Sequence, residues 1–139
     1  MTEAFVVDAS LALAWVLPSQ ASSAAEALLA RIESGAVPVV PALWFLEVAN
    51  GLLAAERRKL LTPAERHQAL GQLSGMRFTV DDESGHAAFG RVSALADEHR
   101  LSVYDAVYLD VALRRALPLG SRDRALVAAA RRRGVSILG

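Results

Sequence analysis

The chain has 139 residues and a mass of 14.8 kDa, with 53% hydrophobic and 22% charged residues, so we expect one compact domain over residues 1–139. It has no cysteine, which excludes a disulfide framework, thiolate metal sites and a thiol nucleophile. Its 15 basic and 15 acidic side chains balance to a net charge of zero, no apolar stretch reaches the about 20 residues of a membrane span, and no basic leader opens the sequence. We therefore expect a cytoplasmic protein with no membrane contact.

The predicted elements alternate between short strands and helices. In chain order they are strand 4–7, helix 11–17, helix 22–33, strand 37–40, helix 41–59, helix 63–74, strand 77–80, helix 84–99, helix 103–116, strand 117–120, helix 122–133 and strand 135–138. Short strands that are apolar on both faces and separated by helices are typical of a mostly parallel sheet with helices on each side. The sequence thus predicts an α/β fold with five strands. Ligands of such folds gather at the carboxyl ends of the strands, where Asp8 and Asp123 lie.

Glu47 is the only charged residue between Pro41 and Ala55. Asn50 is the only other polar side chain of that segment. It follows Glu47 by three residues, which places both on one face of the predicted helix. A carboxylate among apolar neighbours needs a positive or hydrogen-bonding partner. A single buried salt bridge to an arginine is one explanation, and a role in a functional site is the other.

Three further acids lie near the starts of predicted helices. Asp8 and Asp123 each follow a strand, and Asp105 lies three residues after Ser102. Helix capping could explain each acid alone, with Ser10 and Ser121 as alternative capping residues. Three acids at strand-to-helix edges and a fourth, Glu47, on an otherwise apolar helix are also what a shared carboxylate pocket requires. Such a pocket is stabilised in its ionised form by a hard divalent cation such as Mg²⁺.

The segments VVDASLAL, LEVANGLL, LSVYDAVYLDVAL and LPLGSRDRALVAAARRRGVSIL, taken in this order, resemble the PIN-domain ribonucleases, in particular the VapC-like toxins of prokaryotic toxin–antitoxin pairs. The resemblance covers nearly the whole chain. It implies a three-layer α/β/α fold, a Mg²⁺- or Mn²⁺-dependent endoribonuclease activity, a homodimer and an inhibitory antitoxin partner.

Carried over to this sequence, the acids of that family fall on four residues that would hold the metal and form the catalytic site: Asp8, Glu47, Asp105 and Asp123. Asp123 would act directly or through water. Ser10, Asn50 and Ser121 would orient these carboxylates and their waters. Asp110 departs from the family pattern, and we expect it to be exposed or at an interface because it points away from Asp105.

The arginines of the C-terminal part are candidates for binding the RNA backbone. Residues 111–139 hold seven arginines and one acid, whereas residues 1–110 hold eight basic and fourteen acidic side chains. Arginine pairs with phosphate oxygens, although a solvated helix face gives the same pattern. The residues concerned are Arg122, Arg124, Arg131, Arg132 and Arg133. We expect Asp81 and Asp82, by contrast, to cap the helix that begins near Ser84.

Two other functions fit the same sequence less well. A catalytically weak or inactive module that binds RNA or protein would not need all four acids. A phosphoacceptor receiver domain needs a lysine near the end of a late strand, and the only lysine is Lys59, so we discard that alternative. The sequence therefore favours a metal-dependent endoribonuclease, in which a bound ion activates the attacking water.

Overall fold

A computed structural model describes residues 2–138 and has a five-stranded, fully parallel sheet at its centre. The strands are β1 (Ala4–Val7), β2 (Val37–Pro41), β3 (Thr79–Asp81), β4 (Leu119–Gly120) and β5 (Ile137–Leu138), in the spatial order β3-β2-β1-β4-β5. The α/β prediction is confirmed. The order reverses between β1 and β4, which makes the carboxyl ends of these two strands the topological switch point of the sheet.

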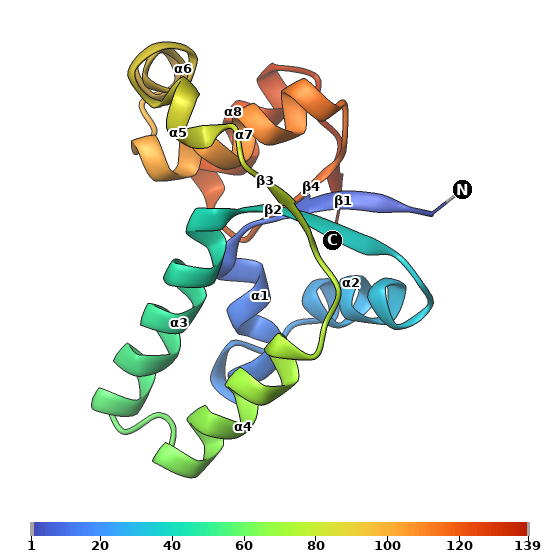
Figure 1. Ribbon diagram of the computed structural model, residues 1–139, viewed down its shortest axis with the longest axis vertical. Helices are drawn as coiled ribbons and strands as arrows, with labels where there is room; N and C mark the ends of the chain where they lie inside the picture. The colour runs from blue at the N-terminus through green and yellow to red at the C-terminus, as the bar shows by residue number, and fades with distance from the viewer. Residues whose placement is uncertain (1, 139) are drawn as a thin grey trace.

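Helices cover both faces of this sheet, as Figure 1 shows. One face carries α1 (Ala9–Val16), the 3₁₀ turn Pro18–Gln20, α2 (Ser23–Glu33), α3 (Ala42–Arg57) and α4 (Pro63–Ser74). The other face carries α5 (Ser84–Ala87), η2 (Ala88–Val92), α6 (Ser93–His99), α7 (Val103–Arg115) and α8 (Arg124–Arg132). The predicted three-layer α/β/α arrangement is therefore confirmed.

The core lies between the sheet and both helix layers. Phe5, Val6 and Val7 of β1 are fully buried because β1 is the central strand and both of its faces are covered. Gly120 of β4 allows α1 and α2 to approach the sheet. A Cβ atom there would lie 2.6 Å from Leu28 Cδ1 and 2.9 Å from Leu11 Cδ2.

Some helix and strand boundaries differ from those predicted from the sequence. Helix α1 begins at Ala9 because Asp8 caps it, accepting a hydrogen bond from Leu11 N, so the expected start at residue 11 with Ser10 as cap was wrong. The predicted helix 84–99 is divided by the π-helical turn η2, and the third strand is 79–81 rather than 77–80. The capping box Thr62–Glu65 is present as predicted.

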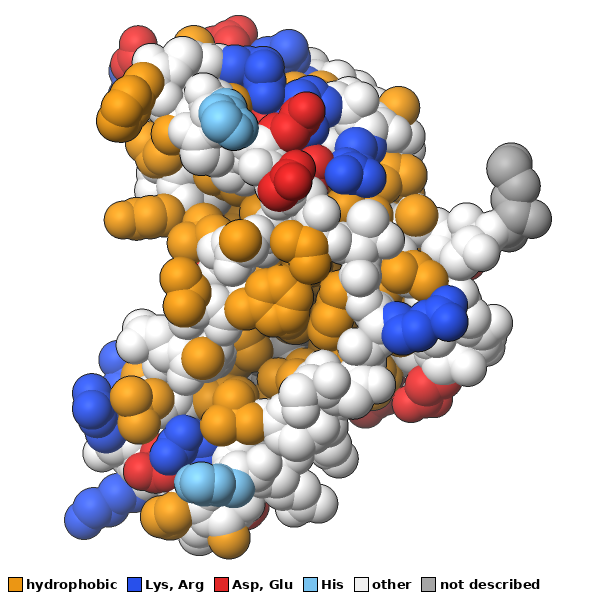
Figure 2. All heavy atoms as spheres, viewed as in Figure 1, with side chains coloured by type: hydrophobic (Ala, Val, Ile, Leu, Met, Phe, Trp, Pro, Cys, Tyr) orange, Lys and Arg blue, Asp and Glu red, His pale blue; other side chains and the backbone are white. Residues whose placement is uncertain are grey.

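Helices α3 and α4 form an antiparallel pair that extends from the body of the molecule (Figure 1). Trp44, Phe45 and Phe78 pack their rings against one another where this pair meets the chain leading to β3. Hydrophobic side chains gather at this place in Figure 2, and a cavity of about 340 Å³ opens between α3 and α4. Within residues 2–138 no helix is both long enough and apolar enough to cross a membrane.

Candidate active site

Asp8 lies at the centre of the switch point. It follows β1, and its backbone N–H donates to the carbonyl of Gly120 in β4 at 3.0 Å. Its carboxylate is only 3% exposed. Oδ1 accepts from Ser10 Oγ at 2.7 Å, and Oδ2 accepts from Ser121 Oγ at 2.5 Å. Asp8 is thus both the cap of α1 and a carboxylate held in one orientation by hydroxyls from both ends of the sequence.

The loop after β4 completes this arrangement. Asp123 caps α8 by accepting from Leu126 N at 2.9 Å, so the cap of that helix is Asp123 and not Ser121. Ser121 Oγ accepts from the backbone N–H of Asp123 at 3.0 Å while it donates to Asp8. Each serine therefore relays a backbone N–H to the Asp8 carboxylate, because Ser10 Oγ likewise accepts from Arg122 N at 3.2 Å.

Asp105 reaches the site from the first turn of α7. Ser102 caps this helix, and its Oγ accepts from the backbone N–H of Asp105 at 3.0 Å. The Asp105 side chain is half-buried, and a side-chain hydrogen bond with Ser102 favours its charged form. No arginine or lysine among residues 2–138 contributes to its electrostatics, so its charge is left to other acids and to a ligand.

Glu47 reaches the site from α3. It is half-buried, and within the described part of the chain its partner is Tyr108, whose hydroxyl donates to Glu47 Oε1 at 2.5 Å. No arginine pairs with it there, so the salt-bridge explanation for this buried acid was wrong. Burial and the carboxylate of Glu47 raise the pKa of the Tyr108 hydroxyl far above its ordinary value, so that the hydroxyl stays protonated and acts as a donor.

Electrostatics links these four residues, which we call the acid cluster: Asp8, Glu47, Asp105 and Asp123. Burial raises the pKa of Asp8 above its ordinary 3.8, and the charge of Asp105 adds to this rise, against the hydrogen bonds it accepts. Burial, and then the charges of Asp105 and Asp8, raise the pKa of Glu47. Burial and the charge of Asp123 raise the pKa of Asp105. Carboxylates that repel one another in this way create a site for a cation.

Carboxylate oxygens suit a hard divalent ion, but the acid cluster does not supply enough ligands to surround one. No three His, Cys, Asp or Glu side chains within residues 2–138 form a group that could itself hold a metal ion. Mg²⁺ is commonly bound through one or two carboxylates and keeps several waters. The acid cluster therefore fits a hydrated ion that keeps several waters, and it does not fit an all-protein cage.

The remaining predicted site residues lie at different distances from the acid cluster. Asn50 follows Glu47 by one helical turn, is exposed, and makes no side-chain hydrogen bond within residues 2–138. Arg124 begins α8 beside Asp123, whereas Arg131 and Arg132 lie in the last turn, about 10 Å further along the helix axis. The guanidinium of Arg122 donates to the carbonyl of Gln20 at 2.8 Å.

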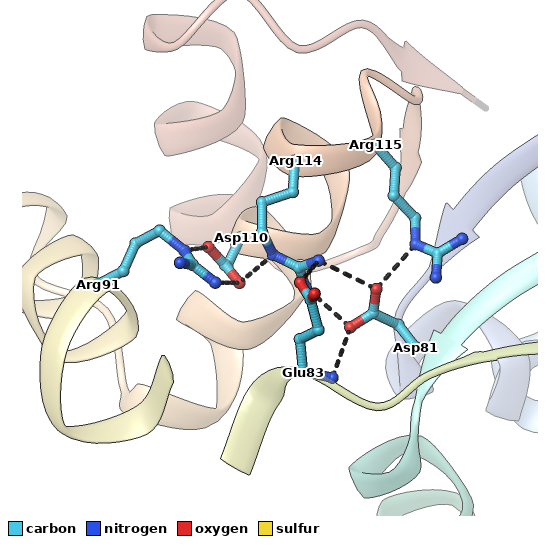
Figure 3. A network of polar contacts seen from close by, with 6 residues as sticks. All are labelled: Asp81, Glu83, Arg91, Asp110, Arg114 and Arg115. Atoms are coloured by element: carbon cyan, nitrogen blue, oxygen red, sulfur yellow. Dashed lines mark hydrogen bonds and ion pairs between the residues drawn. The ribbon is translucent and has the colours of Figure 1, made fainter. Parts of the chain in front are cut away.

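Asp110 and Asp81 are not where the sequence predicted. Both are 1% exposed and belong to an ion-pair network of six residues, drawn in Figure 3: Asp81, Glu83, Arg91, Asp110, Arg114 and Arg115. Asp110 is not at a surface, because its side of α7 packs against η2. Its two cations are Arg91 of η2 and Arg114, which lies one turn further along α7 (Figure 3).

The capping role expected for Asp81 and Asp82 was also wrong. Helix α5 has Glu83 at its N-cap position, with no side-chain capping bond. Asp81 instead accepts from Arg114 and Arg115 at 2.8 Å each, and these partners lower its pKa to about 2. The sequence contained one signal for this pairing, the two adjacent arginines at the end of an otherwise apolar helix.

Tyr108 is a site residue that was not predicted from the sequence. Its signal was its spacing, since a polar group three residues after Asp105 lies on the same side of a helix as that acid.

Comparison with known proteins places this geometry among related chains. The family model described as "PIN domain" matches residues 5–132. PAE2754 from Pyrobaculum aerophilum is similar to this chain, with 26% identity, a TM-score of 0.68, and coverage of 98% of this chain and 83% of that one. Two more distant structures show the same fold. FitAcB from Neisseria gonorrhoeae has 17% identity and a TM-score of 0.62, with coverage of 97% and 96%. A toxin–antitoxin complex from Klebsiella pneumoniae has 20% identity and a TM-score of 0.57, with coverage of 86% of each chain. No curated protein matches the sequence.

Proposed function

Because the chain belongs to the PIN domain family, whose members are generally nucleases, we propose that it is a divalent-metal-dependent endoribonuclease that acts as the toxin of a toxin–antitoxin system. The observation that carries this proposal is the electrostatic coupling near the switch point of the sheet: the charge of Asp105 raises the pKa values of Asp8 and Glu47, and the charge of Asp123 raises that of Asp105. The repulsion between these carboxylates costs free energy, and a bound cation would offset that cost.

Hydrolysis of a phosphodiester needs a nucleophilic water, stabilisation of charge on the phosphoryl oxygens and help for the leaving oxygen. A bound Mg²⁺ or Mn²⁺ supplies Lewis-acid stabilisation and lowers the pKa of a water. Asp8, Glu47 and Asp105 are the residues that would hold the ion, with Asp123 contributing directly or through water. Ser10 and Ser121 fix the orientation of Asp8, and Ser102 stands in the same relation to Asp105.

We assign single-stranded or looped RNA as the substrate, because an enzyme that reads bases needs them unstacked. Arg124 is the best placed of the arginines for a phosphate next to the scissile one, since it is exposed and adjoins Asp123. Arg131 and Arg132 lie at the far end of α8, where they would contact the RNA backbone some nucleotides away. Arg122 is held by Gln20, which makes it the least available of the set.

Neutralising the acid cluster tests the nuclease proposal. We expect Asp8→Asn and Asp105→Asn to abolish Mn²⁺-dependent cleavage of RNA while the protein stays folded, because removing one charge relieves repulsion. Asp97→Asn, at an exposed acid on α6, is the matched control and should cleave like the wild type. Undiminished cleavage by both site variants would show that the acid cluster is not the active site.

An antitoxin partner is supported by the Klebsiella neighbour, which was solved as a toxin–antitoxin complex. The apolar cavity between α3 and α4 is a place on this chain where a partner's hydrophobic side chains could be buried. Inducing the gene in bacteria should arrest growth, and co-expression of a neighbouring short reading frame should relieve the arrest. Unaffected growth on induction would leave only the nuclease proposal.

A homodimer is supported by large hydrophobic residues that the single chain leaves uncovered. Leu46 on α3 is 71% exposed, and the Phe89 side chain on η2 is fully exposed. Light scattering coupled to gel filtration should give twice the mass of the chain, and Phe89→Lys should shift it toward the monomer. A wild-type protein that elutes with the mass of one chain would refute the dimer.

One observation favours a second candidate function, a PIN-like module that binds RNA or protein without cleaving it. The absence of a compact three-ligand group within residues 2–138 is what such a module would show. Manganese separates the two candidates, because a site filled at 100 times its dissociation constant stabilises the fold by about 2.7 kcal/mol. A melting temperature that does not change with Mn²⁺ would favour the binding module.

A further inference from the structure

The strongest contact to Glu47 comes from a residue outside the acid cluster. The Tyr108 hydroxyl donates to Glu47 Oε1 at 2.5 Å, across 61 positions of the sequence. Tyr108 is 1% exposed, so its ring is fixed by the core, and its hydroxyl has a single bonding partner within residues 2–138. The contact therefore joins a rigid donor to the most mobile of the four acids, since glutamate has one more rotatable bond than aspartate.

The other acids do not need such help. Asp8 has three hydrogen-bond donors of its own, and Asp123 is fixed by capping α8. Asp105 has a short side chain on the first turn of α7. Glu47 is half-buried and has no cationic partner within residues 2–138, so without Tyr108 its carboxylate would turn toward solvent and away from the charges of Asp8 and Asp105.

Tyr108 also lies three residues after Asp105 on α7, on the same side of that helix. The hydrogen bond thus ties the Glu47 carboxylate of α3 to the helix that carries Asp105, and it engages Oε1 alone of the two carboxylate oxygens.

We propose that Tyr108 is a positioning residue of the acid cluster, which holds Glu47 against Asp105 so that a divalent cation binds. This rests on the proposed metal-dependent function and adds to it the residue that sets the geometry of the Glu47 carboxylate. Outer contacts of this kind typically change metal affinity by about 10- to 100-fold when they are removed.

The test uses Tyr108→Phe, which removes one oxygen and keeps the ring in the core. We expect its Mn²⁺ dissociation constant, measured by calorimetry without RNA, to be about 10- to 100-fold weaker than that of the wild type. Cleavage should lose activity at low Mn²⁺ and regain a kcat close to the wild-type value at saturating Mn²⁺. Tyr104→Phe is the matched control, because Tyr104 is 61% exposed on the same helix, and its affinity should not change.

A double-mutant cycle separates positioning from a general effect on folding. Glu47→Asp shortens the acid beyond the reach of the phenol, so adding Tyr108→Phe to it should change the Mn²⁺ dissociation constant by less than about twofold. A Tyr108→Phe protein with wild-type Mn²⁺ affinity would overturn the positioning role while leaving the nuclease proposal intact. A wild-type protein that binds no Mn²⁺ would overturn both.

Discussion

Arg114 is the centre of the ion-pair network in Figure 3, and replacing it by methionine probes what that network contributes. Its guanidinium donates to Asp110 Oδ2 at 2.8 Å, to Asp81 Oδ1 at 2.8 Å and to Glu83 Oε2 at 2.5 Å. The side chain is 19% exposed, and the Asp81 and Asp110 side chains are 1% and 2% exposed. Methionine keeps much of the apolar stem but leaves two buried carboxylates short of a cation.

Breaking a buried ion pair by removing one partner costs about 3–5 kcal/mol. Each buried acid keeps one other arginine, Arg91 for Asp110 and Arg115 for Asp81. We therefore expect Arg114→Met to lower the free energy of unfolding by about 3 kcal/mol, at the lower end of that range. At about 4 °C per kcal/mol for a domain of this size, the melting temperature should fall by about 12 °C.

Urea unfolding followed by circular dichroism measures this change. Arg115→Met is the matched control, because Arg115 is 37% exposed and pairs with Asp81 alone within residues 2–138, so its loss should cost about 1 kcal/mol or less. The penalty of Arg114→Met should shrink as the pH is lowered, since a protonated carboxyl group needs no cation. A loss no larger than that of Arg115→Met would refute the view that Arg114 neutralises two buried acids.

Three further predictions concern stability and the site. Folding raises the pKa values of Asp8, Glu47 and Asp105, so the metal-free protein should become more stable as the pH falls through these raised values toward the ordinary 3.8–4.5. It should lose stability again as the pH approaches 2, where Asp81 is protonated. Melting temperatures that rise steadily with pH from about 4 to 8 would contradict this prediction. Gly120→Ala should destabilise the fold by about 1–3 kcal/mol in chemical unfolding, since its Cβ would lie 2.6 Å from Leu28 Cδ1, and a neutral effect would mean that the helix layer shifts freely. Ser121→Ala removes a donor from Asp8, so Mn²⁺ affinity measured by calorimetry should fall about 10-fold, whereas Ser19→Ala, at an exposed residue, should leave it unchanged.

Much of the fold could be predicted because its signals are local. Alternating strands and helices predicted the parallel sheet, and Thr62 to Glu65 form the predicted capping box. The π-helical turn at Ala88–Val92 could not be predicted, because no proline or paired glycine marks it. The cap of α1 was predicted two residues late because Asp8 and Ser10 are equally good capping residues, and in the folded chain Leu11 N donates to Asp8.

The candidate site was predicted as a set of residues but not as a geometry. The four acids were found because each is a polar exception at the edge of an apolar segment. Asp110 looked the same in sequence, and its different role depends on Arg91, nineteen residues away on another element. Tyr108 was overlooked because a tyrosine in an apolar helix is usually a core residue, and its hydroxyl gains a meaning only when α3 and α7 are packed together.

The hydrogen bond between Ser121 and Asp8 spans 113 positions, and it has a consequence for the synthesis of the protein. The ribosome makes Asp8 113 residues before Ser121. A nascent chain that ends before β4 carries Asp8 and Ser10 but has neither the Ser121 hydroxyl, which is the second to bind the Asp8 carboxylate, nor Asp123. The site that we propose for cleavage therefore cannot assemble before β4 and the loop that follows it have been made.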